Sequence, residues 1–132
     1  LALKKELISK VPFFAHASSN LIHELSKKLK PIIYLPNDII FSEGDISKEM
    51  FFIGRGTLAI YKGDDENPIA ILQDGNCFGE LSLIHAKPRN ATAKALHYCD
   101  LYSLNKEDFE EILTEYPKFA QHIQSIAEMR KH

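Results

Sequence analysis

The residues best suited to binding chemistry lie in residues 75–93, a stretch that holds one arginine and one glutamate. Gly79 permits a close approach of the backbone to a ligand and conformations that other residues avoid. Residues 81–84 are predicted to form a short helical segment, whose free N–H groups would attract a phosphate. Arg89 would reach in from the far side with its planar fork of donors. This stretch therefore predicts a small cradle for an anion.

The alternation of residue types after Pro88 predicts the direction of the Arg89 side chain. Arg89 shares one face of a predicted strand with alanines at positions 91, 93 and 95, and polar residues take the other face. The alanine face is expected to be buried, and a buried arginine needs an anion. On this reasoning two anions remain open, which are Glu80 in a structural ion pair and the phosphate of a ligand.

Length and charge set limits on the function. The 132 residues predict one domain with its own core. Sixteen Lys and Arg nearly balance 18 Asp and Glu without a basic stripe, so we expect no nucleic-acid partner. No apolar run is long enough to insert into a membrane, and no signal peptide is present. Cys77 and Cys99 lack the spacing of metal ligands and are expected to be free thiols.

Apolar periodicity predicts helices before and after the central region. The first covers residues 1–11, and the second begins near Ser18 or Ser19 and ends at Pro31. Their apolar stripes are Leu3, Leu7, Ile8 and Val11, then Leu21, Ile22, Leu25 and Leu29. Asn105 is predicted to cap a third helix, and Pro117 suits the first position of a final one. The apolar line of that final helix is Phe119, Ile123 and Ile126, and it leads to Arg130.

Between residues 31 and 104 the pattern changes to short apolar runs separated by turn residues. The runs are 32–35, 39–41, 50–53, 58–61, 69–72, 91–96 and 101–104. Many short strands at this spacing predict a sandwich or a jelly-roll barrel. The expected fold class is α+β, an antiparallel β-roll with N-terminal helices and two C-terminal helices. The expected boundaries are 1–30, 31–104 and 105–132.

Residues 75–93 resemble the phosphate-binding cassette of the cyclic-nucleotide-binding domain family. The family pattern is Phe-Gly-Glu, then a Leu, then Arg-x-Ala-Ser/Thr, and it stands here as Phe78-Gly79-Glu80, Leu83 and Arg89-Asn90-Ala91-Thr92. Domains of that family bind cAMP or cGMP, so the resemblance implies a cyclic nucleotide as ligand. It also favours the ligand phosphate over Glu80 as the partner of Arg89.

More specifically, the chain is similar to the cytoplasmic ligand-binding domain of cyclic-nucleotide-gated and hyperpolarisation-activated cation channels. The similarity lies in residues 11–14, 36–38, 44–50 and 100–104, the last leading to 115–117. It implies a tetrameric parent protein in the plasma membrane, with residues 1–30 ending a linker from its transmembrane pore. The first residue is Leu1 rather than Met, so we also expect a fragment of a longer chain. The cassette itself also resembles that of protein kinase A regulatory subunits.

The resemblance implies a role for each site residue. Glu80 would accept the ribose 2′-hydroxyl, and Arg89 would pair with the phosphate. The other residues expected at the phosphate and ribose are Phe78, Gly79, Leu81, Ser82, Asn90 and Ala91. The residues expected at the purine are Ile60, Leu72 and Arg130, the last on a final helix that acts as a lid.

Asn90 departs from the family pattern, because cGMP-responsive channels usually have Thr directly after the arginine. We therefore expect cAMP to bind more tightly than cGMP. The alternatives are a domain of a kinase regulatory subunit, the sensor of a transcriptional regulator, and an enzyme of the cupin type. The six histidines are scattered and form no His-x-His motif, so we expect no metal, no cofactor and no catalysis.

Overall fold

The structure is a computed structural model that describes residues 5–6, 8–9, 11, 14–15 and 17–129, without the side chains of 126, 127 and 129. Residues 5–6 and 8–9 are helical, as the apolar pattern of residues 1–11 predicts. Ile8 and Val11 of that pattern are buried. Leu3 and Leu7 lie outside the described residues.

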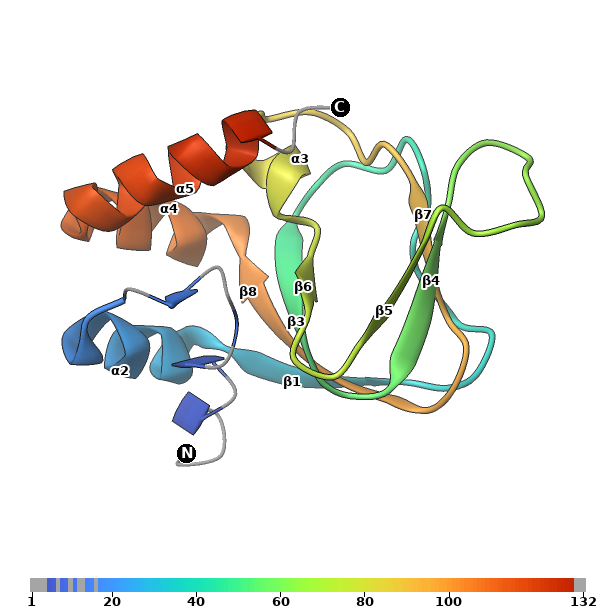
Figure 1. The fold of residues 1–132 in the computed structure, drawn as a ribbon, viewed down its shortest axis with the longest axis horizontal. Coiled ribbons are helices and arrows are strands. Elements are labelled where there is room, and N and C mark those ends of the chain that lie inside the picture. Colours follow the sequence, from blue (N-terminus) through green and yellow to red (C-terminus); the bar gives the residue numbers. More distant parts are fainter. Residues whose placement is uncertain (1–4, 7, 10, 12–13, 16, 130–132) are drawn as a thin grey trace.

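The helices gather at one end of the molecule and the strands at the other (Figure 1). The N-terminal half comprises α2 (Ser19–Lys28), β1 (Lys30–Tyr34), β2 (Ile39–Phe41), β3 (Glu49–Arg55) and β4 (Thr57–Tyr61). The C-terminal half comprises β5 (Ala70–Gln73), β6 (Cys77–Phe78), α3 (Glu80–Ile84), β7 (Thr92–Ala95), β8 (Cys99–Asn105), α4 (Lys106–Glu115) and α5 (Pro117–Met129). Within the described residues, no helix combines the length and apolar character needed to cross a bilayer.

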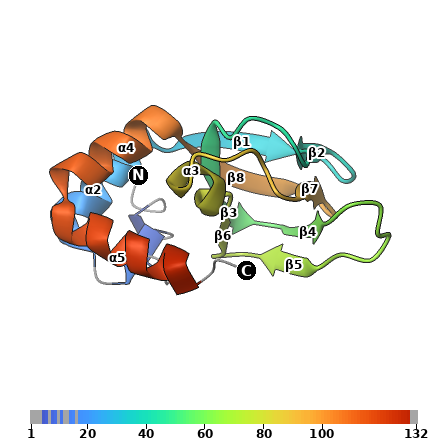
Figure 2. The same ribbon diagram turned by 90° about the horizontal axis from the view of Figure 1, so that it is seen from above.

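The strands form two antiparallel sheets of four strands each, in the orders β1-β8-β3-β6 and β2-β7-β4-β5 (Figure 2). Between the sheets lies an apolar core of Phe51, Ile53, Leu58, Phe78, Ala93, Ala95, Cys99 and Leu101. The α+β prediction of an antiparallel β-roll is confirmed, with two sheets in place of one closed barrel. The sequence pattern missed β6, because a strand of two residues is too short to show a period.

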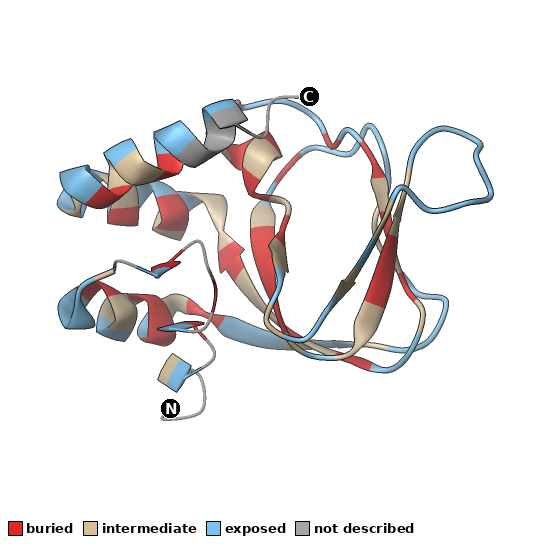
Figure 3. Ribbon diagram, viewed as in Figure 1, coloured by how far each residue is buried: buried red, intermediate tan, exposed pale blue. Residues whose placement is uncertain are grey.

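Residues 50–53 of strand β3 are all buried (Figure 3). Because successive side chains of a strand alternate, both faces of its middle are covered. Phe51 and Ile53 point into the core between the sheets. Met50 and Phe52 alternate with them and belong to a second core, which the helices cover. The helical side of that core includes Leu21, Leu25, Phe109, Ile112, Phe119 and Ile123. One strand therefore joins the roll to the helices.

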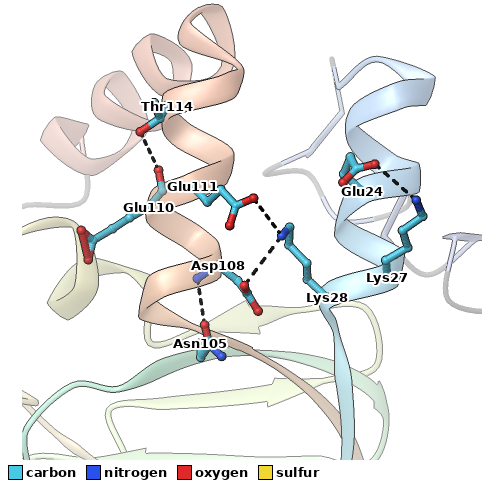
Figure 4. A network of polar contacts seen from close by, with 8 residues as sticks. All are labelled: Glu24, Lys27, Lys28, Asn105, Asp108, Glu110, Glu111 and Thr114. Carbon is cyan, nitrogen blue, oxygen red and sulfur yellow. Dashed lines mark hydrogen bonds and ion pairs between the residues drawn. The ribbon is translucent and has the colours of Figure 1, made fainter.

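Two predicted helix caps are formed. The Ser18 hydroxyl accepts a hydrogen bond from the backbone N–H of Leu21 at 3.2 Å. The Asn105 side chain accepts one from the backbone N–H of Asp108 at 2.8 Å (Figure 4). Helix α2 ends at Lys28, which is earlier in the chain than the predicted end at Pro31. Pro31 lies in β1 at the edge of its sheet, where a missing N–H is tolerated.

Lys28 links α2 to α4 through two carboxylates (Figure 4). Its ammonium lies 3.7 Å from Asp108 Oδ1 and 3.4 Å from Glu111 Oε1. Burial acts to lower the pKa of Lys28, but the acidic neighbours outweigh it and the net pKa is raised. Lys28 therefore stays charged at neutral pH, and these ion pairs supplement the apolar packing between the two helices.

Candidate functional site

The guanidinium of Arg89 is buried, with 3% of the residue exposed. Its Nη1 donates to the carbonyl of Gly79 at 2.9 Å, and its Nη2 donates to the carbonyl of Glu49. The carboxylate Oε1 of Glu49 lies 3.8 Å from Nη2. The ring centre of Phe41 lies 4.1 Å from Cζ, which is a cation–π contact. Among the described residues, Arg89 Nε has no hydrogen-bond partner although it is buried.

Charges around Arg89 offset part of the cost of burying it, and the net pKa of Arg89 is lowered. Burial lowers the pKa of Arg89, whereas the carboxylates of Glu49, Asp45 and Glu80 raise it, in that order of size. An arginine pKa starts so far above neutrality that the guanidinium remains charged. The site therefore keeps a permanent cation in a largely dry environment.

The backbone of Arg89 is fixed by the loop between β2 and β3. The N–H of Gly44 donates to the carbonyl of Arg89, and the N–H of Arg89 donates to the carbonyl of Asp45, both at 2.8 Å. Beyond Arg89 the predicted alternation is confirmed, because the alanines at positions 91, 93 and 95 are buried and Asn90 is exposed. Arg89 therefore precedes β7 and lies on the same buried side as its alanines.

Gly79 is required for two separate reasons. Its φ of +87° is left-handed, a conformation in which side chains are strained. A Cβ at this position would also lie 2.8 Å from Nη1 of Arg89. Gly79 caps α3, and Glu80 follows as the first residue of that helix, with 5% exposure. The glycine therefore lets the cassette backbone approach the arginine.

Arg89 and Glu80 border a pocket of about 180 Å³. All eight residues predicted at the phosphate and ribose line it, namely Phe78, Gly79, Glu80, Leu81, Ser82, Arg89, Asn90 and Ala91. Of the predicted purine residues, Ile60 also lines the pocket. Leu72 does not; it packs against the core between the sheets. Arg130 lies outside the described residues.

The described part of α5 does not line this pocket. Phe119 and Ile123 of α5 are instead buried in the helix-covered core, which also contains Leu83 of α3. The final helix therefore touches the same core as the cassette helix. Its closure over a purine stays a prediction.

Three further residues of the site were missed by the sequence reasoning. Phe41 and Cys77 line the pocket, and Glu49 contacts Arg89 without lining it. Cys77 directly precedes the Phe-Gly-Glu motif, so its position was a usable signal. Phe41 and Glu49 meet Arg89 only through the fold, since Glu49 lies 40 residues earlier in the chain.

The donor set of the pocket suits an anion. It combines the buried guanidinium with the start of α3, where the first N–H groups of a helix have no partner within the helix. Within the described part of the chain, no three His, Cys, Asp or Glu side chains gather as a metal site would require.

A Gly79→Ala substitution should separate the two reasons for glycine. The matched control is Gly75→Ala, because Gly75 has nearly the same φ, +86°, but open space where its Cβ would stand. We expect both variants to lose about 1–2 kcal/mol from backbone strain, and Gly79→Ala to lose more because Arg89 must move. Urea unfolding of both variants measures this. Equal losses would contradict the close approach of Arg89 to this backbone.

Residues 31–116 match the protein family described as "Cyclic nucleotide-binding domain". Similar proteins include the rod photoreceptor alpha subunit of the cyclic nucleotide-gated channel of Gallus gallus, 40% identical over 118 residues. The alpha-3 channel of Homo sapiens is 38% identical over 119 residues, and the alpha-2 channel of Bos taurus 40% over 116. The three alignments cover 85%, 86% and 83% of this chain but only 18%, 17% and 18% of the respective relatives. The chain belongs to the cyclic nucleotide-binding domain family.

Proposed function

We propose that the pocket beside Arg89 binds a cyclic nucleotide, with cAMP preferred, and that the domain regulates a cation channel. The observation that carries the proposal is the buried guanidinium at the pocket wall. It is charged, its Nε has no partner among the described residues, and its carboxylate neighbour Glu49 lies at 3.8 Å. A cation in such a place attracts an anion that can come closer.

The cyclic phosphate would lie between Arg89 and the start of α3. The backbone N–H groups of Leu81 and Ser82 and the Ser82 hydroxyl are suited to its oxygens, and Gly79 leaves room for them. The buried carboxylate of Glu80 is suited to accept the ribose 2′-hydroxyl. Apolar groups of Phe78, Ala91 and Ile60, which line the pocket, would accompany the ribose and purine. The family resemblance adds Leu72 and Arg130 as contacts of the purine.

The parent protein is proposed from the relatives, which are named as cyclic nucleotide-gated channel subunits and not as enzymes. We infer a longer chain with a transmembrane pore and a linker, tetrameric in the plasma membrane, with this domain on the cytoplasmic side. A ligand would shift the domain from one conformation to another only if it binds the two conformations with different affinities. A kinase regulatory subunit is the second choice, because its support is the cassette alone.

Removing the charge of Arg89 should weaken cAMP binding, whereas removing the charge of an arginine away from the pocket should not. In calorimetric titrations, Arg89→Ala should lose about tenfold to a hundredfold in affinity, since a charge-assisted hydrogen bond contributes about 1.5–3 kcal/mol. Arg55→Ala is the control, because Arg55 is exposed and does not line the pocket. Circular dichroism establishes that each variant is folded.

Two outcomes would contradict the proposal. One is a folded wild-type domain that takes up no cAMP. The other is a folded Arg89→Ala variant whose cAMP affinity equals that of Arg55→Ala. In either case Arg89 and its carboxylate neighbours would be a structural cluster.

The preference for cAMP rests on Asn90, which lines the pocket directly after Arg89. Asparagine lacks the hydroxyl that the resemblance associates with guanine. In a competition titration we expect cGMP to displace cAMP only at higher concentration. The Asn90→Thr substitution should reduce the difference between the affinities for cAMP and cGMP. Equal affinities of the wild-type domain for the two nucleotides would overturn this preference.

A further inference from the structure

Glu49 contacts Arg89 but is not among the residues that line the pocket. It is the first residue of β3, and its side chain is 36% exposed. Its carboxylate forms an ion pair with Nη2 of Arg89, yet the residue does not line the pocket. A ligand phosphate in the pocket and the Glu49 carboxylate would thus both act on the guanidinium of Arg89.

The guanidinium of Arg89 is positioned by contacts other than the side chain of Glu49. Two backbone carbonyls accept hydrogen bonds from the guanidinium, those of Gly79 and of Glu49 itself. The ring of Phe41 covers one face of the guanidinium. Backbone hydrogen bonds with residues 44 and 45 fix the main chain of Arg89. None of these contacts uses the Glu49 carboxylate, so we expect them to remain when an amide replaces it.

What the carboxylate adds is negative charge close to a buried cation. Three carboxylates act on Arg89, and among them Glu49 is the nearest ion pair and the largest influence. In the ligand-free domain this charge supplies the largest carboxylate contribution to compensating the buried guanidinium. Toward an approaching phosphate the same charge cancels part of the attraction of Arg89.

We propose that Glu49 attenuates nucleotide affinity, acting as a built-in counter-anion that stabilises the ligand-free domain and weakens the hold of Arg89 on phosphate. The proposal rests on the proposed function, because it concerns the same pocket. The proposal predicts that one substitution changes stability and nucleotide affinity in opposite directions. Loss of the Glu49 charge should lower the stability of the ligand-free domain and raise its affinity for a charged nucleotide.

The test is the substitution Glu49→Gln, titrated calorimetrically with cAMP and, in parallel, with adenosine, which lacks the phosphate. The affinity for cAMP should rise about twofold to fivefold, as expected for removal of one partly exposed charge. The affinity for adenosine should stay unchanged. Glu66→Gln is the matched control, because it changes the net charge equally at an exposed loop position away from the pocket.

Two further variants keep the test decisive. Glu49→Asp retains the charge and should bind cAMP nearly as the wild type does. Asp45→Asn removes the second carboxylate that acts on Arg89, keeps an oxygen for the hydrogen bond from Ser42, and should tighten cAMP binding more weakly than Glu49→Gln. If Glu49→Gln does not fold, the Asp45→Asn result decides, and unchanged or weaker binding would overturn the proposal.

The outcomes separate this inference from the proposed function. No cAMP binding by the wild-type domain would overturn the proposed function and the attenuation together. Binding by the wild type with equal or weaker binding by a folded Glu49→Gln variant would overturn the attenuation alone. An equal rise in adenosine affinity would also overturn it, because the effect would then not depend on the phosphate charge.

Discussion

The buried positive charge of Arg89 determines which residues can surround it and therefore how the pocket is built. An arginine with 3% exposure requires compensation in every direction, and each neighbour of Arg89 supplies part of it. Two carbonyls and a carboxylate meet its nitrogens, and the ring of Phe41 meets its face. Gly79 has no Cβ where one would collide with it. The unpartnered Nε, among the described residues, is the position at which this compensation is incomplete.

The surroundings of Arg89 are held in place by aromatic packing that reaches β3. Phe41 lies 5.9 Å from Phe78, and Phe78 stacks on Phe51 at 5.2 Å between ring centres. On the other face of β3, Phe52 lies 5.3 Å from Phe14, which stacks on Phe119 of α5 at 5.2 Å. Each such pair contributes about 0.5–1.5 kcal/mol beyond the area it buries. The pocket and the final helix therefore share one strand as their support.

Local patterns predicted much of this arrangement. The alternation after Pro88 predicted the buried direction of Arg89, and the side-chain oxygens of Ser18 and Asn105 predicted two helix starts. Such features depend on neighbours within a few residues. The contact of Glu49 with Arg89 joins residues 40 apart, and no period in the sequence encodes it. The interpretation of Arg89 as paired with either Glu80 or a phosphate omitted the carboxylate that forms the ion pair.

Binding of a phosphate by the guanidinium of Arg89 can be tested most directly with the NMR signal of its own Nε–H. In a ¹⁵N-edited NMR spectrum, this resonance is assigned by its absence in Arg89→Lys. We expect saturating cAMP to shift the resonance strongly, because a charged acceptor would meet an N–H that has no partner among the described residues, and adenosine to shift it little. An Nε–H resonance that stays in place while cAMP binds would rule out a phosphate at this nitrogen.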